Sequence, residues 1–154
     1  MATSLERIRL MAAGAVPAPP IAELLGFRLT SAAEGEAVIE FEAGRRHANP
    51  MGTLHGGVLC DIADAAMGMA YAGTLADGET FTTVELKINF LRPVWQGRLI
   101  ARGRVVKGGR TMGLVECDVT DDAGRLVARA SSTCMILRGE QADGRRVAAP
   151  DAAG

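Results

Sequence analysis

The residues best suited to chemistry lie in one short run, from Asn49 to Asp64. Within this run, Gly56 and Gly57 stand where a long helix is expected to begin, so their bare backbone N–H groups lie at the positive end of the helix dipole. A negative oxygen that develops on a reacting carbonyl is stabilised at such a position. Two glycines also suit an ordinary helix start, so this feature alone leaves a structural explanation open.

The second chemical group is the carboxylate of Asp64, which stands in the second turn of the same helix among apolar residues. A carboxylate there is costly to desolvate unless it has partners. Asp61 stands in the first turn, where the helix dipole stabilises a negative charge and water can reach it, so we interpret Asp61 as structural. Asp64 is expected to lie deeper, and we interpret it as the functional carboxylate.

The spacing of these two groups points to a second subunit. Gly56 and Asp64 are eight residues apart on one helix, a separation of about 12 Å. A reacting carbonyl must lie ~3 Å from both its oxyanion donor and its attacking group. One helix cannot supply both groups to one substrate, whereas two antiparallel copies from two subunits can. The pattern therefore predicts a homodimer with shared sites.

One long helix and a sheet that covers it must position these groups. The run Gly56–Leu75 is apolar on nearly every side, which is typical of a buried helix. Strand-like alternation precedes it at Ile39–Ala43, and four strand candidates follow it with short turns between them: Val84–Phe90, Arg98–Val106, Met112–Thr120 and Leu126–Leu137. We predict an α+β fold in which an antiparallel meander wraps around a central helix. The open edges of such a sheet also favour dimerisation.

The sequence divides into three parts. Residues 1–25 are expected to form an N-terminal helical segment with a proline-rich break. Residues 26–138 contain the sheet and the long helix and form the single main domain. Residues 139–154 are polar and rich in Ala, Gly and Asp, so we expect a disordered tail.

Local signals give the remaining elements. Short helices are expected over Ser4–Met11 and Ile21–Leu25, and the second should end at Gly26. Residues Gly44–Leu54 are expected to form a long loop, in which His47 is an exposed side chain.

Composition argues against several kinds of partner. The formal net charge is −1 and only 4% of the residues are aromatic, so nucleic-acid binding is not expected. No metal site is expected either, because the chain has only two histidines and no CxxC pair. The three cysteines are widely spaced and suggest a reducing compartment rather than disulfides.

The long apolar run contains Asp61 and Asp64, so it does not predict a membrane span. The apolar stretch near the N-terminus is too short for a signal peptide. We therefore expect a cytoplasmic protein.

The run Asn49–Asp64 resembles the PaaI-like hotdog thioesterases, close to the 4-hydroxybenzoyl-CoA thioesterase group. Asn stands six residues before His55 and Asp nine residues after it, and a second block, Thr83–Pro93, supports the resemblance. The similarity extends from about Gly26 to Leu137. It implies a hotdog fold and hydrolysis of an acyl-CoA thioester to a free acid and CoA.

The resemblance also implies roles for individual residues. The Gly56 N–H would polarise the thioester carbonyl, and Asp64 of the other subunit would act as nucleophile or general base. Asn49 would position the attacking water or the carbonyl, and His55 would help to hold the loop. Thr83 matches a position where a hydroxyl can orient water. Some relatives have a hydroxyl residue one turn after the carboxylate, whereas this chain has Gly68 there.

Further residues are candidates for substrate binding. Gly57 lies at the oxyanion end of the helix, and Arg92, Lys107 and Arg110 are candidates to meet the phosphates of CoA, although each is also explained as a solvated surface charge. Met67, Met69 and Met112 line either an acyl pocket or the core: Met residues fill cores more often. CoA is part of the substrate, so no separate cofactor is expected. The expected assembly is a homodimer, extended to a dimer of dimers.

Other functions fit less well. A Ser/His/Asp hydrolase is disfavoured because the sequence has no GlyXSerXGly elbow. A hotdog dehydratase and a non-catalytic acyl-CoA sensor on the same fold remain as alternatives. A sensor would not need Asp64 and would usually carry a DNA-binding segment, for which the first 25 residues lack a helix-turn-helix pattern.

Overall fold

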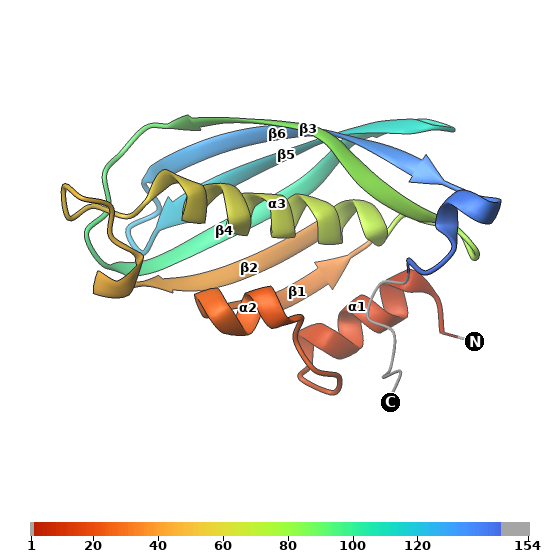
Figure 1. Ribbon diagram of the computed structural model, residues 1–154, viewed down its shortest axis with the longest axis horizontal. Helices are drawn as coiled ribbons and strands as arrows, with labels where there is room; N and C mark the ends of the chain where they lie inside the picture. The colour runs from red at the N-terminus through yellow and green to blue at the C-terminus, as the bar shows by residue number, and fades with distance from the viewer. Residues whose placement is uncertain (1, 146–154) are drawn as a thin grey trace.

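Six antiparallel strands curve around one long helix, α3 (Gly56–Ala72), in the computed structural model, which describes residues 2–145 (Figure 1). The strands lie in the sheet in the order β1-β2-β4-β5-β6-β3. Their bounds are β1 (Phe27–Ala33), β2 (Glu36–Ala43), β3 (Thr80–Phe90), β4 (Gly97–Gly108), β5 (Met112–Asp121) and β6 (Leu126–Leu137). This architecture confirms the predicted α+β class.

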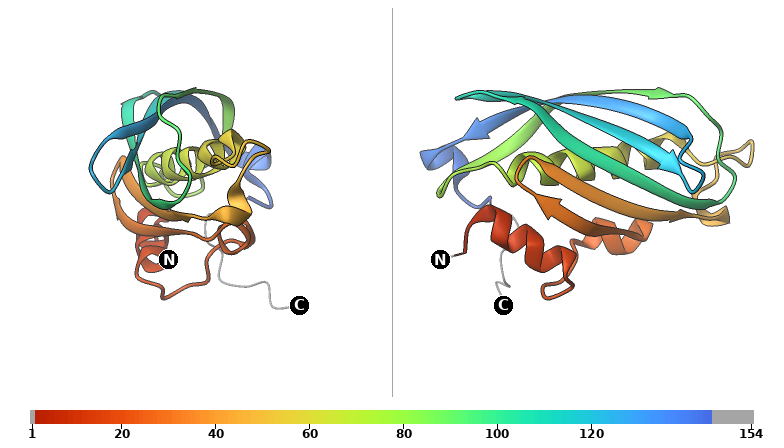
Figure 2. Two further views of the ribbon diagram at one scale, coloured as in Figure 1. Left: turned by 90° about the vertical axis from the view of Figure 1, so that its left-hand side faces the viewer. Right: turned by 180° about the vertical axis from the view of Figure 1, so that it is seen from behind.

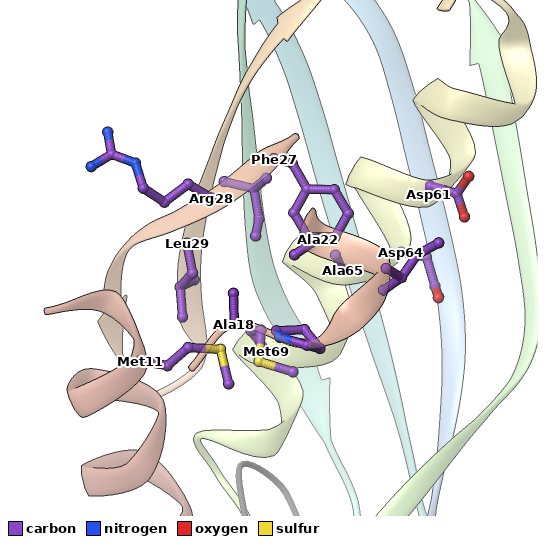
Figure 3. A pocket seen from close by; sticks show the side chains of 13 residues that line it. Met11, Ala18, Ala22, Phe27, Arg28, Leu29, Asp61, Asp64, Ala65 and Met69 are labelled. Carbon is purple, nitrogen blue, oxygen red and sulfur yellow. The ribbon is translucent and has the colours of Figure 1, made fainter. Parts of the chain in front are cut away.

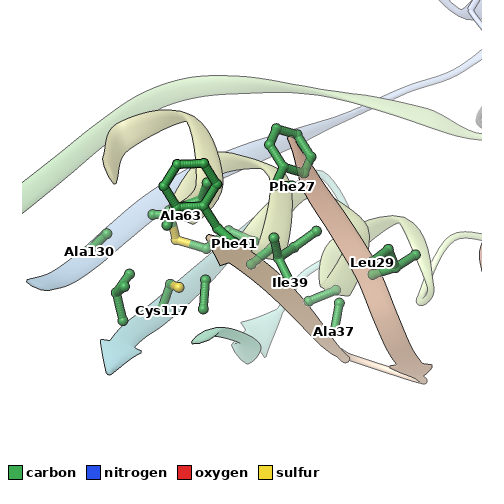
Figure 4. Close-up of a cluster of buried hydrophobic side chains, with 14 of the residues drawn as sticks. Phe27, Leu29, Ala37, Ile39, Phe41, Ala63, Cys117 and Ala130 are labelled. Atoms are coloured by element: carbon green, nitrogen blue, oxygen red, sulfur yellow. The ribbon is translucent and has the colours of Figure 1, made fainter. Parts of the chain in front are cut away.

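The core lies between the concave face of the sheet and α3. Alternation along β2 turns Ile39 and Phe41 toward the helix, and both side chains are buried. Figure 4 shows them in one apolar cluster with Phe27 and Leu29 of β1 and Ala63 of α3. Burial of this continuous apolar surface holds the helix against the sheet.

The helix approaches the sheet most closely at Gly103 of β4. A Cβ atom at this position would collide with the backbone of Ala66 in α3. Glycine at position 103 therefore allows the close helix–sheet distance that the rest of the core is packed around.

The strand order departs from the predicted meander at one point. β3 does not pair with β4, which follows it in the chain, but with β6, from Thr80 opposite Leu137 to Phe90 opposite Ala128. The prediction of successive hairpins is therefore wrong for β3, because a short connection does not oblige neighbouring strands to pair. As a result, β3 and β1 form the two edges of the sheet.

All five predicted strands are present, and the structure adds a sixth, β1, which the sequence pattern does not predict. Its inward alternation covers only Phe27 and Leu29, and a shift in the pairing with β2 follows between Leu29 and Ser31. The helix α3 also ends at Ala72 rather than at the predicted Leu75. Within residues 2–145, no helix is both long enough and apolar enough to cross a membrane.

The N-terminal helices α1 (Ser4–Ala12) and α2 (Pro20–Leu25) pack beneath the β1 edge of the sheet (Figure 2). Ile8 of α1 is completely buried, and Ala22 of α2 is buried as well. α2 ends at Gly26, whose φ of 85° is the left-handed conformation that glycine adopts most easily, as predicted. The first 25 residues therefore contribute to the same core as the sheet.

The chain continues past β6 into the segment for which a tail is predicted. Gly139–Ala142 form a short 3-10 helix, η2. Just before it, Arg138 pairs with Glu79, with 2.6 Å between Nη2 and Oε1, and donates to the backbone oxygen of Arg110. These contacts hold the end of β6 at Arg138, and the disorder of the tail that begins at residue 139 stays a prediction. The end of the predicted tail, residues 146–154, lies outside the part of the chain that the structure describes.

Candidate active site

The loop that leads into α3 is closed by the side chain of Asn49. Its Oδ1 accepts hydrogen bonds from the backbone N–H groups of Met51 and Thr53, at 3.0 and 3.1 Å, and its Nδ2 donates to Thr53 Oγ1 at 2.8 Å. These bonds occupy both lone-pair directions of Oδ1 and leave one amide hydrogen of Nδ2 free for another partner. Asn49 thus shapes the loop and keeps one donor available.

The first turn of α3 has one occupied and one unoccupied donor. His55 Nδ1 accepts from the Gly57 N–H at 2.9 Å and so caps the helix. Within residues 2–145, the Gly56 N–H makes no hydrogen bond. The predicted oxyanion donor, Gly56, is therefore available, whereas the N–H of Gly57 already has a partner.

A physical reason for glycine at position 56 comes from the edge strand. The ring of Phe90, at the end of β3, lies against Gly56, and a Cβ atom there would come within 2.8 Å of Phe90 Cζ. A larger residue would have to displace this ring or the start of the helix. The glycine therefore serves packing as well as any chemistry at its N–H.

His47 is buried, which corrects the prediction of an exposed loop side chain. The Gly44 N–H donates to His47 Nδ1 at 3.0 Å, so Nε2 carries the proton and donates to the backbone oxygen of Leu25 at 2.8 Å. The ring also packs edge-on against Phe41, with 4.7 Å between ring centroids. Because the His47 oxygen accepts from the His55 N–H at 2.9 Å, this residue links α2 to the start of α3.

Asp64 lies on a face of α3 that stays open in the single chain, together with Asp61 and Gly57. Both side chains are exposed in the single chain, because the sheet covers the opposite side of the helix. Thr83 of β3 donates to Asp64 Oδ1 at 3.5 Å. Thr83 is also 3.9 Å from Cys134 Sγ on the neighbouring strand β6.

The surroundings of Asp64 disfavour its charged form. Desolvation by the apolar groups packed beside it raises the pKa of Asp64 above its ordinary range, and the negative charge of Asp61 acts in the same direction. The hydrogen bond from Thr83 opposes both effects because it stabilises the carboxylate. A carboxyl with a raised pKa is a stronger base once it is ionised.

The glycine that replaces the hydroxyl of some relatives also has a packing role. A Cβ atom at Gly68 would come within 3.3 Å of the Phe81 ring. A side chain at position 68 would therefore require a small shift of this ring, and the hydroxyl that bonds to Asp64 comes from Thr83.

The three basic candidates do not meet within one chain. Arg92 follows β3 and lines a surface cavity of about 460 Å³ together with Trp95. Lys107 and Arg110 lie at the turn between β4 and β5, at the far end of β4. The 12 residues of β4 separate these ends by roughly 36 Å. One chain therefore cannot offer all three cations to the same phosphate group.

A second cavity, of about 340 Å³, opens beside Asp64 between α3, β1 and the N-terminal helices (Figure 3). Of the three methionines predicted to line either an acyl pocket or the core, Met69 lines this cavity. Met67 is buried in the core, and Met112 is exposed on the sheet. The outer wall of the cavity, which includes Ala18 and Ala22, was not foreseen. The only sequence signal for that wall is a proline-rich break with small apolar residues.

Within the part of the chain that the structure describes, no three His, Cys, Asp or Glu side chains gather as a metal site would require. Both histidines have structural partners: His47 bonds to Gly44 and Leu25, and His55 caps α3. The groups that remain at this site are the carboxylate of Asp64, the hydroxyl of Thr83 and the N–H of Gly56.

Comparisons with known proteins show the family to which the chain belongs. The family model of the Thioesterase superfamily matches residues 51–128. Human acyl-coenzyme A thioesterase 13 is 32% identical over 107 residues, which cover 68% of this chain and 76% of the human protein.

Solved structures match over most of their length. A phenylacetic acid degradation-related protein from Ralstonia eutropha JMP134 is 33% identical, with a TM-score of 0.76, over 84% of this chain and 98% of its own. The PaaI protein of E. coli, at 24% identity, shares the fold with a TM-score of 0.78 over 89% of this chain and 98% of its own. The predicted hotdog fold and the resemblance to PaaI-like thioesterases are confirmed.

Proposed function

Because the chain belongs to the Thioesterase superfamily and is a thioester hydrolase, we propose that it cleaves an acyl-CoA to a free acid and CoA, with Asp64 as the catalytic carboxylate. The observation that carries this proposal is the pairing of two features on α3. Asp64 lies on an open face beside the Thr83 hydroxyl, and the Gly56 N–H at the helix start has no partner in the described chain. The reaction needs no cofactor, since CoA enters as part of the substrate.

The chemistry follows from these few groups. The Gly56 N–H donates to the thioester oxygen and stabilises the negative charge that develops there. Asp64 either attacks the carbonyl carbon, which gives a mixed anhydride that water hydrolyses, or removes a proton from the attacking water. In both routes the C–S bond breaks and CoA leaves as a thiolate. A thiolate is a good leaving group, so no strong general acid is required.

The remaining candidates support these steps. His55 holds the helix start through its bond to Gly57, which in turn shapes the end where the carbonyl binds. The free amide hydrogen of Asn49 is directed to the substrate carbonyl or the attacking water. Thr83 orients Asp64 or the water beside it.

We further propose that each site is shared by two subunits. The carboxylate and the Gly56 N–H of one chain are about 12 Å apart along the helix, too far to serve one carbonyl. The face that carries Asp64 is open, and the neighbouring edge strand β3 has unpaired backbone groups and exposed apolar side chains at Val84 and Phe90. A second copy that packs here antiparallel brings its own Gly56 to Asp64.

The basic residues then belong to CoA binding across the assembly. Since Arg92 is far from Lys107 and Arg110 in one chain, we propose that different subunits present them to the CoA phosphates, in a dimer or a dimer of dimers. The three cysteines are free, in keeping with action in the reducing cytoplasm.

The proposal is tested by measuring thiol release from a panel of acyl-CoAs. We expect turnover with at least one acyl-CoA, and Asp64→Asn should lower kcat by roughly a hundredfold or more. Asp61→Asn is the matched control, since it removes a carboxylate one turn away on the same face and should have a much milder effect. Near-normal turnover by a folded Asp64→Asn protein would show that another group performs the reaction.

The shared site is tested by mixing two inactive variants. An Asn49→Ala chain and an Asp64→Asn chain form heterodimers in which one site carries both lesions and the other carries neither. Activity should rise from near zero to about half of the wild-type value for each heterodimer, by the counting of sites under two-fold symmetry. In the control, the double variant mixed with wild type leaves one lesion in every heterodimer site, so no gain is expected. Verified heterodimers that remain inactive would disprove the shared site.

A further inference from the structure

The cavity beside Asp64 has the shape and lining of a pocket for a flexible apolar group. Its α3 wall runs from Asp61 to Met69, about 12 Å of helix axis. The opposite wall comes from the N-terminal helices, with Met11 of α1 and Ala22 of α2. The pocket is therefore elongated along α3, and it is longer than a single aromatic ring requires.

The polar groups of this cavity lie at its edge. Asp61 and Asp64 stand at one end in Figure 3, whereas the side chain of Arg28 points away from the cavity and toward Glu40, 3.5 Å from its carboxylate. The rest of the lining consists of alkyl, ring and thioether side chains, among them Leu29 and Met69. An acyl chain that enters past Asp64 would meet no side chain able to bond a hydroxyl group.

We propose that this cavity holds the acyl chain of the substrate, and that the substrate class is an unbranched aliphatic acyl-CoA of medium length. This inference rests on the proposed thioesterase function. It adds that the N-terminal segment, together with β1, forms the wall of the acyl pocket opposite α3. It also adds that the pocket belongs to the subunit that supplies Asp64, because Met69 and Asp64 lie on one helix.

Chain length gives the first test. The value of kcat/KM should rise by about fourfold for each methylene added from butyryl-CoA to decanoyl-CoA, and should not rise further at palmitoyl-CoA. In Met69→Trp, which fills the pocket, the ratio of kcat/KM for decanoyl-CoA to that for butyryl-CoA should fall at least tenfold. Met112→Trp, which makes the same change at an exposed site, should keep the wild-type ratio.

A second variant covers the case in which Met69→Trp does not fold. Met69→Ala enlarges the pocket and should move the best substrate to a longer acyl chain. A folded Met69→Trp or Met69→Ala protein with the wild-type chain-length profile would overturn the proposal.

Polarity of the acyl group gives an independent test of the pocket. The kcat/KM for 4-hydroxyphenylacetyl-CoA should be lower than that for phenylacetyl-CoA by about fivefold or more, because its hydroxyl would be buried without a partner. Equal values would contradict an apolar pocket.

The heterodimer of Asn49→Ala and Asp64→Asn chains shows which subunit provides the pocket. Its one intact site takes Asp64 from the Asn49→Ala chain. Adding Met69→Trp to that chain should abolish the preference for decanoyl-CoA, whereas adding it to the Asp64→Asn chain should leave the preference unchanged. The reverse result would place the pocket on the other subunit and overturn this inference alone. A heterodimer that is inactive without any change at Met69 would instead refute the shared site proposed above.

Discussion

The start of α3 and its middle are held in different ways. At the start, His55 accepts from Gly57 at 2.9 Å, and Asn49 accepts from Thr53 at 3.1 Å, so the loop and the first turn are closed by their own side chains. In the middle, the only hydrogen bond that the Asp64 side chain makes within residues 2–145 is the 3.5 Å contact with Thr83. Its helix face is open to solvent in the single chain.

The helix start therefore has its hydrogen-bond partners within one chain, whereas the surroundings of Asp64 are left incomplete by a single chain. The bonds at the helix start fix the Gly56 N–H before any partner or substrate binds, which is the preorganisation that oxyanion stabilisation requires. The carboxylate has the opposite character, because desolvation already raises the pKa of Asp64 and few donors compensate it. Changes at the helix start should therefore reduce stability, whereas changes around Asp64 should alter activity with little loss of stability.

The largest stability effect is expected at His47. His47→Ala removes a buried ring and leaves the Leu25 oxygen and the Gly44 N–H without their bonds, so the free energy of unfolding should fall by about 2–4 kcal/mol. Urea denaturation measures this change. His47→Phe keeps a ring against Phe41 but not the hydrogen bonds, and should recover only part of the loss. A loss below about 0.5 kcal/mol for His47→Ala would mean that the helix start does not depend on this residue.

A smaller effect is expected at the cap itself. His55→Ala leaves the Gly57 N–H without an acceptor, which should cost about 1 kcal/mol of unfolding free energy. His55→Asn offers another side-chain acceptor at the cap and should restore much of that loss. Equal stability of His55→Ala and wild type in denaturant titrations would show that the bond contributes nothing. Because the Gly56 N–H is retained, kcat should fall much less than in Asp64→Asn.

The two regions also differ in how far the sequence predicts them. Gly56 and Asp64 stand out because a glycine pair and a carboxylate are unusual in an otherwise apolar helix, and helix geometry then relates them. The burial of His47 depends on Leu25, which lies 22 positions away in the chain, and no local pattern reports such a contact. The cavity is similarly non-local, since Met11 and Met69 meet across it only after the N-terminal helices have packed on β1.

The fold shows the same division. The periodicity of single elements predicted α3 and five of the six strands, because alternation along one strand reports which face is buried. The pairing of β3 with β6 joins segments that are distant in sequence, so hairpin signals could not predict it. The open side of α3 was missed for a related reason: small residues such as Ala65 are apolar on any face and do not reveal which face the sheet covers.

The electrostatics of the open region can be tested through the pH profile of activity. If ionised Asp64 is the active form, kcat/KM should fall on the acidic side at a pH above the ordinary Asp range, because desolvation raises the pKa of Asp64. Thr83→Val removes the hydrogen bond that lowers this pKa, so the acidic limb should move to still higher pH. Thr83→Ser keeps a hydroxyl and should leave the limb near its wild-type position. A limb that moves to lower pH in Thr83→Val would mean that Thr83 does not stabilise the carboxylate.

The smallest effect, and the sharpest contrast with His47, is expected for the stability of Asp64→Asn. Since the pKa of Asp64 is raised in the fold, its charged form is less favourable there than in the unfolded chain. Ionised Asp64 therefore lowers stability at pH values above its raised pKa, and this penalty disappears below the ordinary Asp range, where the carboxyl is protonated in both states. Asp64→Asn should then melt at the same temperature as wild type or up to a few degrees higher at neutral pH, and the two curves should converge as the pH falls. Thermal melts at matched protein concentration measure the difference. A melting temperature for Asp64→Asn well below that of wild type at neutral pH would mean that the carboxylate stabilises the protein, and the distinction between the two ends of the site would then fail.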